Sequence, residues 1–162
     1  MERMISIRFE EFGSVAELNK SDRELLGQAT LASETSYSPY SSFEVGAAVR
    51  LANGEVISGS NQENAAYPSG LCAERVALFF AQAKFPEIPV DAIAIYARSR
   101  EFKLDKPVTP CGSCRQVMAE YENRHGRKIR VIMGNDDGHV QITEGIESLL
   151  PLMFMLDKLK KK

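Results

Sequence analysis

The chain has 162 residues, of which 44% are hydrophobic and 26% are charged, and its formal net charge is −2. This length and composition are typical of one globular domain with a core of its own. The near-neutral charge offers no broad basic surface for a phosphate backbone, so we expect no nucleic-acid partner.

The sequence also indicates where in the cell the protein is expected. No apolar stretch approaches the ~20 residues that a membrane-spanning helix needs. The first residues, MERMISIRFEEF, mix charged with apolar side chains and lack the apolar core of a signal peptide. Three cysteines are an odd number, which argues against a secreted disulfide framework. We therefore expect a cytoplasmic protein with no membrane partner.

The first half of the chain predicts a helix followed by a β-hairpin. Ser21 and Glu24 match a capping box, and a helix from there to about residue 36 would place Leu25, Leu26, Ala29 and Ala32 on its apolar side. The β-rich residues 43–51 precede Asn53-Gly54, a strong signal for a tight hairpin turn. Residues 55–60 are then the returning strand.

The second half alternates helices with strands. The spacing of Leu71, Arg75, Leu78 and Phe79 predicts a helix over residues 71–85, and a second helix is expected over residues 111–126. Further strands are predicted at residues 91–99, 128–134 and 139–143, and a short helix cut by Pro151 at residues 144–155. This order indicates the α/β class: a mixed, partly parallel sheet of about five strands with helices on both faces.

The three cysteines raise a choice of chemistry. Cys111 and Cys114, in CGSC at the start of a predicted helix, could be a redox pair, half of a zinc site, or small buried residues. Cys72 also lies in the first turn of a predicted helix. Two helices that follow strands of one sheet bring their N-termini to the same edge, where ligands commonly bind. Three thiolates with an open fourth position would be a catalytic zinc arrangement, because His125 and His139 are more often solvated or hydrogen-bonded than ligating.

Glu74 lies two residues after Cys72. A carboxylate at a helix start is stabilised by the helix dipole, and that structural role is one interpretation. The other is a general acid and base that reaches a water molecule at the metal without binding the ion itself. The residues alone leave both open.

Several segments resemble one known family in order along the chain. CAER (72–75) and PCGSCRQ (110–116) resemble the zinc motifs of the cytidine deaminase family, in its short form with cysteine ligands only. SPYSSFEVGAA (38–48), SGSNQENAAYPSG (58–70) and LLPLMF (149–154) resemble its other segments, so the resemblance spans about residues 26–154. It implies a single cytidine deaminase-like α/β/α domain over residues 1–162. The implied reaction is the zinc-dependent hydrolysis of cytidine or deoxycytidine to uridine or deoxyuridine and ammonia, a reaction of pyrimidine salvage.

The resemblance also implies roles for individual residues. One Zn²⁺ per subunit would be held by Cys72, Cys111 and Cys114, and Glu74 would shuttle protons while hydroxide attacks C4 of the base. Arg75 and Gln116 would hydrogen-bond or orient the ligands. The implied substrate-binding residues are Phe43 on the base, Asn61 and Glu63 on the sugar, the backbone of Ala73, and Tyr67 and Phe154 at a subunit contact of a homotetramer.

Some features depart from the family pattern or leave alternatives. The N-terminal extension at residues 1–20 has no family counterpart and is expected to add an edge strand, and the segment from Cys72 to Cys111 is longer than usual. The tail at residues 155–162 is basic and is interpreted as a solvated end. The alternatives are a structural zinc module, which would need a fourth protein ligand, and a deaminase of a related substrate, such as a nucleotide or an antibiotic nucleoside.

Overall fold

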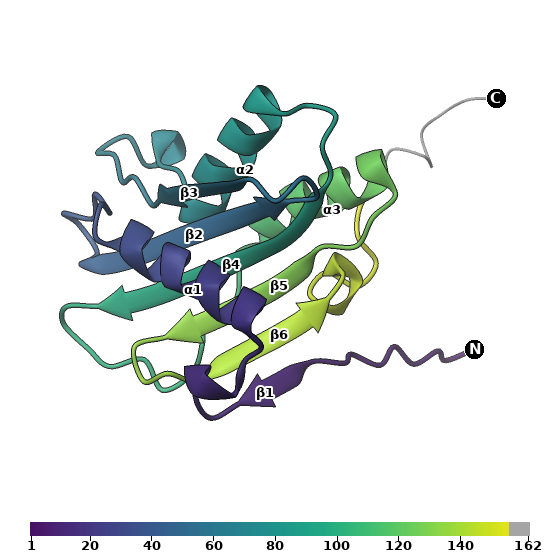
Figure 1. Ribbon diagram of the computed structural model, residues 1–162, viewed down its shortest axis with the longest axis horizontal. Helices are drawn as coiled ribbons and strands as arrows, with labels where there is room; N and C mark the ends of the chain where they lie inside the picture. Colours follow the sequence, from purple (N-terminus) through teal and green to yellow (C-terminus); the bar gives the residue numbers. More distant parts are fainter. Residues whose placement is uncertain (156–162) are drawn as a thin grey trace.

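The computed structural model describes residues 1–155 and places six strands in one mixed sheet, in the order β1-β6-β5-β4-β2-β3 (Figure 1). Only β4 and β5 run parallel, and the other neighbouring strands of this sheet are antiparallel. The strands are β1 (Glu10–Phe12), β2 (Phe43–Leu51), β3 (Val56–Ser60), β4 (Val90–Ser99), β5 (Arg130–Asn135) and β6 (Val140–Glu144).

Helices cover both faces of the sheet. Helix α1 (Lys20–Ser33) packs on one face, and helices α2 (Ala73–Lys84) and α3 (Gly112–His125) pack on the other (Figure 1). Single 3-10 turns occur at Val15–Glu17, Tyr67–Ser69 and Ile146–Ser148. The chain enters α2 after β3 and α3 after β4. The starts of these two helices lie together, since the sulfur atoms of their N-cap residues Cys72 and Cys111 are 3.8 Å apart.

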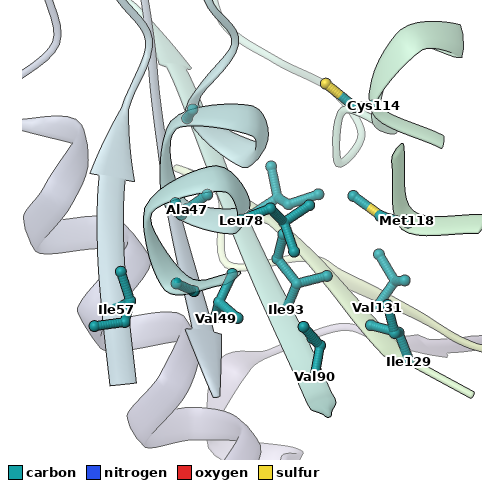
Figure 2. Close-up of a cluster of buried hydrophobic side chains, with 14 of the residues drawn as sticks. Ala47, Val49, Ile57, Leu78, Val90, Ile93, Cys114, Met118, Ile129 and Val131 are labelled. Atoms are coloured by element: carbon teal, nitrogen blue, oxygen red, sulfur yellow. The ribbon is translucent and has the colours of Figure 1, made fainter. Parts of the chain in front are cut away.

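The sheet has one hydrophobic core on each face, and the two differ in side-chain size. Successive residues of a strand point to opposite faces, and large and small residues alternate along β4. On β4, Ile93 and Ile95 face α2 and α3, while Ala92 and Ala94 face α1. The small residues let α1 approach the sheet closely. The larger cluster on the other face fixes α2 and α3, and Figure 2 shows Leu78 and Met118 reaching from these two helices toward Val49, Ile93 and Val131.

The expected α/β class, with helices on both faces of a mixed sheet, is confirmed. The sheet has six strands, where about five were expected, because β1 from the N-terminal extension pairs with β6 at the sheet edge. Residues 156–162, most of the tail interpreted as basic and solvated, lie outside the described part of the chain.

The predicted boundary of the first helix was wrong. Asn19, not Ser21, is the N-cap of α1, and its Oδ1 accepts a hydrogen bond from the backbone N–H of Asp22 at 2.9 Å. Either residue type can cap a helix, so composition did not separate them. The helix ends at Ser33 instead of residue 36.

Two further expectations need correction. Of the residues expected on one face of the second helix, only Leu78 is fully buried; Leu71 precedes the helix, and Phe79 is 43% exposed. The closing helix over residues 144–155 is reduced to the turn Ile146–Ser148, since Gly145 has a φ of +84° and Pro151 interrupts the chain. Within residues 1–155, no helix has the length and apolar composition needed to cross a membrane.

Candidate metal centre and active site

Three cysteines meet where α2 and α3 begin. Cys72 and Cys111 are the N-cap residues of these two helices, and Cys114 lies in the first turn of α3. The Sγ atom of Cys111 lies 3.8 Å from that of Cys72 and 3.5 Å from that of Cys114. Neither N-cap sulfur accepts a capping hydrogen bond from a backbone N–H of its own helix, so both are available as metal ligands.

The sulfur geometry fits a zinc ion. Tetrahedral coordination with Zn–S bonds of ~2.3 Å separates neighbouring sulfurs by about 3.8 Å, close to the distances found. Among the described residues, no histidine, aspartate or glutamate joins the cluster, whose three ligand atoms all lie within 4.8 Å of one another. Nε2 of His125 instead lies 3.0 Å from Oε1 of Gln82. Three protein ligands with an open position are typical of catalytic zinc.

The sulfurs lie in a positively polarised environment. A hydrogen bond from the Cys114 thiol, with further help from the Arg75 guanidinium, lowers the pKa of Cys72 to about 5. Nη2 of Arg75 is 3.6 Å from Sγ of Cys72. The pKa of Cys114 is raised, because its thiol donates to Cys72 and is buried. Cys72 therefore ionises before Cys114, and the helix N-termini stabilise thiolate as well.

Glu74 lies beside this cluster on the first turn of α2 and is 5% exposed. Burial raises the pKa of its carboxyl group above the ordinary value of 4.5, and the neighbouring Cys72 thiolate adds to the effect. A carboxyl group with a raised pKa holds a proton more readily than an exposed glutamate does, which suits a group that must accept and then donate a proton. Such groups cluster at functional sites.

A cavity of about 600 Å³ opens onto Cys72, Cys111 and Glu74. One wall is apolar and consists of Val45 from β2, Ile95 and Ala97 from β4, and Val108. The rest of the lining is mostly polar and aromatic. Its residues include Tyr40, Ser41, Asn61, Glu63, Asn64 and Tyr67. The combination of apolar walls with a few polar groups is typical of a small-molecule site.

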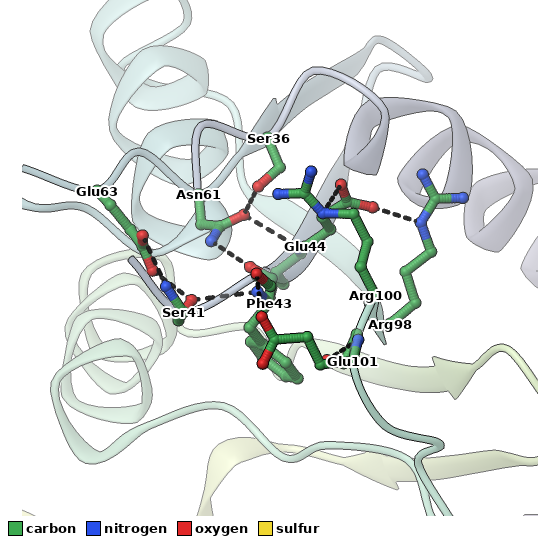
Figure 3. A network of polar contacts seen from close by, with 12 residues as sticks. Ser36, Ser41, Phe43, Glu44, Asn61, Glu63, Arg98, Arg100 and Glu101 are labelled. Carbon is green, nitrogen blue, oxygen red and sulfur yellow. Dashed lines mark hydrogen bonds and ion pairs between the residues drawn. The ribbon is translucent and has the colours of Figure 1, made fainter. Parts of the chain in front are cut away.

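Asn61 and Glu63, expected to bind a sugar, both line this cavity and both brace the loop before β2 (Figure 3). Asn61 Oδ1 accepts from the backbone N–H of Val45 at 2.9 Å and from Ser36 Oγ at 2.5 Å, and its Nδ2 donates to the Phe43 carbonyl at 2.9 Å.

Glu63 Oε2 accepts from the backbone N–H of Tyr40 at 2.9 Å, and Oε1 accepts from the Ser41 hydroxyl. The Ser41 hydrogen bond is the main reason that the pKa of Glu63 is lowered.

The other expected site residues divide into two groups. Phe43, Ala73, Tyr67 and Arg75 line the cavity. Gln116 and Phe154 do not. Nε2 of Gln116 donates to the backbone carbonyl of Phe154 at 2.9 Å, and the Phe154 side chain is 65% exposed. Gln116, expected to orient the ligands, thus holds the C-terminal segment in the described chain through this hydrogen bond.

Sequence reasoning missed the apolar wall and Arg115. Val45, Ile95 and Ala97 have the composition of ordinary core residues, and they form a wall only through the pairing of Val45 with Ala97 between β2 and β4. Arg115 follows Cys114 directly, and that adjacency was the available signal. Its guanidinium binds the loop that leads into Cys111.

Fold and site together define a metal-dependent α/β enzyme with a three-cysteine centre at the start of two helices. Residues 19–127 match the family model described as cytidine and deoxycytidylate deaminase zinc-binding region. The chain belongs to this family. It is thus a deaminase of the cytidine deaminase type, a hydrolase whose zinc-binding region contains Cys72, Cys111 and Cys114.

Known relatives agree with this assignment. A cytidine deaminase of Halalkalibacterium halodurans is 44% identical over 135 residues, which cover 82% of this chain and 94% of that protein. A cytidine deaminase of Sporosarcina psychrophila is 37% identical, with 84% and 93% covered. The crystal structure of a Burkholderia pseudomallei cytidine deaminase superposes with a TM-score of 0.72 at 38% identity, covering 85% of this chain and all of that one.

Proposed function

We propose that this chain hydrolyses cytidine and deoxycytidine to the corresponding uridines and ammonia, with Glu74 as the proton shuttle. The observation that carries the proposal is the position of Glu74, a buried carboxyl group next to three clustered thiols at the end of a cavity. A structural zinc module would have no use for a buried acid at an open metal position. It would also need a fourth ligand, and the described residues supply none.

A zinc ion held by the three cysteines would polarise water and lower its pKa. Glu74 would take a proton from the attacking water and pass it to ring N3 of the base, which makes C4 more electrophilic. It would then carry the second proton to the departing amine, so that cytidine and water yield uridine and ammonia. The raised pKa of Glu74 supports both halves of this task, because one group must accept and then donate.

We assign the base to the apolar end of the cavity and the sugar to its polar rim. Phe43 would pack on the pyrimidine, and the N–H of Ala73, at the start of α2, has no partner within its helix and is free for a ligand atom. Asn61 and Glu63 would bind ribose hydroxyls with the hydrogen-bonding capacity left after they brace the loop. A Glu63 carboxylate also disfavours a 5′-phosphate at this rim, which supports a nucleoside over a nucleotide.

Assembly belongs to the same proposal. Phe154 is exposed and lies away from the cavity of its own chain, which supports a role in closing the pocket of a neighbouring subunit. Tyr67 is also exposed, and it lines the cavity mouth where such a neighbour would approach. We therefore propose a homotetramer. Three unpaired cysteines that hold a metal suit a reducing compartment, so we keep the cytoplasm as the proposed location.

The test is Glu74→Gln, with Glu120→Gln on the exposed side of α3 as a matched control. We expect Glu74→Gln to retain zinc and to lose roughly 10²- to 10⁴-fold in kcat for cytidine. Absorbance assays with cytidine, deoxycytidine, cytidine monophosphate and adenosine would run side by side. A zinc-loaded parent protein that deaminates neither cytidine nor deoxycytidine would refute the function, and Glu74→Gln at the parental rate would refute the mechanism.

A further inference from the structure

The residue between the metal ligand Cys114 and Gln116 makes more hydrogen bonds than its neighbours. Nε of Arg115 donates to the carbonyl of Pro110 at 2.6 Å, Nη2 donates to the hydroxyl of Thr109 at 2.8 Å, and Nη1 donates to the carbonyl of Leu149 at 2.5 Å. Its backbone N–H also donates to the carbonyl of Cys111 at 3.0 Å. Arg115 thus binds the carbonyl groups on both sides of the Cys111 Cα atom, those of Pro110 and of Cys111 itself.

This arrangement matters because Cys111 is the most exposed of the three sulfur donors. Cys114 is buried within α3, but Cys111 is exposed and ends a long loop without helix or strand that follows β4. Pro110 has no backbone N–H with which to anchor this loop. The planar guanidinium of Arg115, called the Arg115 fork below, anchors the loop instead, through its hydrogen bonds to Thr109 and Pro110. It ties the loop to the first turn of α3, where Cys114 already lies.

The partners of the Arg115 side chain support the same role. All three acceptors of its guanidinium are neutral oxygens, and no carboxylate within residues 1–155 lies close enough to form an ion pair with it. Arg115 therefore acts on this region through hydrogen bonds to the loop and the C-terminal segment, and not through an ion pair.

We infer that Arg115 is a positioning residue for the metal centre, which fixes Cys111 and the pocket-wall residue Thr109 against α3 and ties the C-terminal segment to the same helix through Leu149. Outer partners of metal ligands commonly control ligand orientation and metal retention. The planar fork of arginine reaches three acceptors at once, which a lysine ammonium on a flexible stem does not reproduce. The inference rests on zinc binding by the cysteines, and it does not depend on which nucleoside is the substrate.

The experiment measures zinc release from the holoenzyme into an excess of a chromophoric chelator, in the absence of substrate. Arg115→Gln is expected to release zinc roughly 10- to 100-fold faster than the parent. Arg124→Gln is the matched control, since Arg124 is on the same helix and also donates to a proline carbonyl, that of Pro86 at 2.8 Å. It should release zinc at the parental rate. If Arg115→Gln does the same, the inference is wrong.

Two further variants keep the test decisive if Arg115→Gln does not fold. Thr109→Val removes one of the three acceptors and should accelerate release about threefold, with a raised KM because Thr109 lines the cavity. Arg115→Lys keeps the charge and loses the fork, and it should release zinc nearly as fast as Arg115→Gln. A lysine variant that matches the parent would show that charge alone suffices and would overturn the positioning role. A parent that binds no zinc would instead contradict the proposed function.

Discussion

Nη2 of Arg75 donates a hydrogen bond to Sγ of Cys72 at 3.6 Å, one turn along the same helix. The guanidinium therefore draws negative charge away from a metal ligand. Three thiolates on one Zn²⁺ leave a net negative centre, which weakens its ability to polarise water. The position of Arg75 leads us to expect that it counteracts this weakness without occupying a coordination position.

Replacing Arg75 by Gln should lower kcat for cytidine about tenfold, because a hydrogen bond to a charged group is lost and the charge on the sulfurs is no longer offset. Zinc content should stay near one per chain, since the three ligands remain. Steady-state kinetics and metal analysis of the same preparation would check both. Arg23→Gln, at an exposed position of α1, is the control. Unchanged kcat in Arg75→Gln would show that the contact has no catalytic consequence.

Asn61 braces the start of β2 and also lines the cavity, so its substitution should affect both folding and substrate binding. Asn61→Ala removes three hydrogen bonds that hold the start of β2 and the preceding loop (Figure 3). Leaving the buried partners unpaired costs about 1–3 kcal/mol, so the melting temperature should fall together with a rise in KM. Thermal melts and KM for cytidine would be measured in parallel. A variant with raised KM and an unchanged melt would assign Asn61 to the substrate alone.

Glu63→Gln should separate binding from folding. Glu63 lies on the exposed rim, and glutamine retains one acceptor for the Tyr40 and Ser41 donors. We expect KM for cytidine to rise roughly tenfold with little change in the melting temperature, because a hydrogen bond to a carboxylate is stronger than one to an amide. Cytidine monophosphate should become a relatively better ligand as the negative charge is removed. If KM is unchanged, Glu63 serves the loop and not the sugar.

The strands and the metal ligands could be predicted because their signals are local. Apolar runs identify β2 and β4, and the paired spacing of Cys111 and Cys114, with Cys72 at a second helix start, indicates a shared site. Resemblance to a family then added expected roles for residues such as Asn61, whose sequence context is that of a polar loop.

Features that depend on long-range packing could not be predicted. The pocket wall exists because β2 and β4 pair with Val45 opposite Ala97. The Arg115 fork depends on where a long loop and the C-terminal segment return to α3, which residue spacing does not encode. Asn19 and Ser21 are both good N-caps, and the choice between them depends on the packing of the whole helix against the sheet.

Gly46 and Gly27 offer a matched test of how closely α1 approaches the sheet. A Cβ atom on Gly46 would collide with the carbonyl oxygen of Ala29 and the backbone nitrogen of Ser33, both in α1. Gly27 lies within α1, and a Cβ atom added to it would meet no other atom within 4 Å. Gly46→Ala should therefore destabilise the protein by several kcal/mol or prevent folding (on the order of 3 kcal/mol for overpacking).

Gly27→Ala should instead stabilise the protein by roughly 0.5–1 kcal/mol, since alanine is the better helix former. Urea unfolding of both variants gives the two free-energy changes directly. Equal effects of the two substitutions would mean that α1 does not pack against β2 as closely as the structure places it.

Glu122 should make folding stability depend on pH in a direction that the structure fixes. Burial raises its pKa above the ordinary 4.5, although hydrogen bonds from the backbone N–H groups of Ile129 and Ile146 act the other way. The folded chain then binds this proton more tightly than the unfolded chain. The contribution of Glu122 to stability is accordingly greatest below the unfolded pKa, falls as pH rises through the folded pKa, and is constant above it.

Glu122→Gln removes this titration and keeps an acceptor oxygen for the two N–H groups, which both bind Oε1 of Glu122, at 2.7 and 3.0 Å. The variant should therefore gain stability relative to the parent as pH increases from about 4.5 upward. Urea unfolding across this range would give the difference at each pH, with Glu120→Gln on the same helix as an exposed control. A difference that runs in the opposite direction would show that the hydrogen bonds outweigh burial and that the carboxylate is the form that the fold prefers.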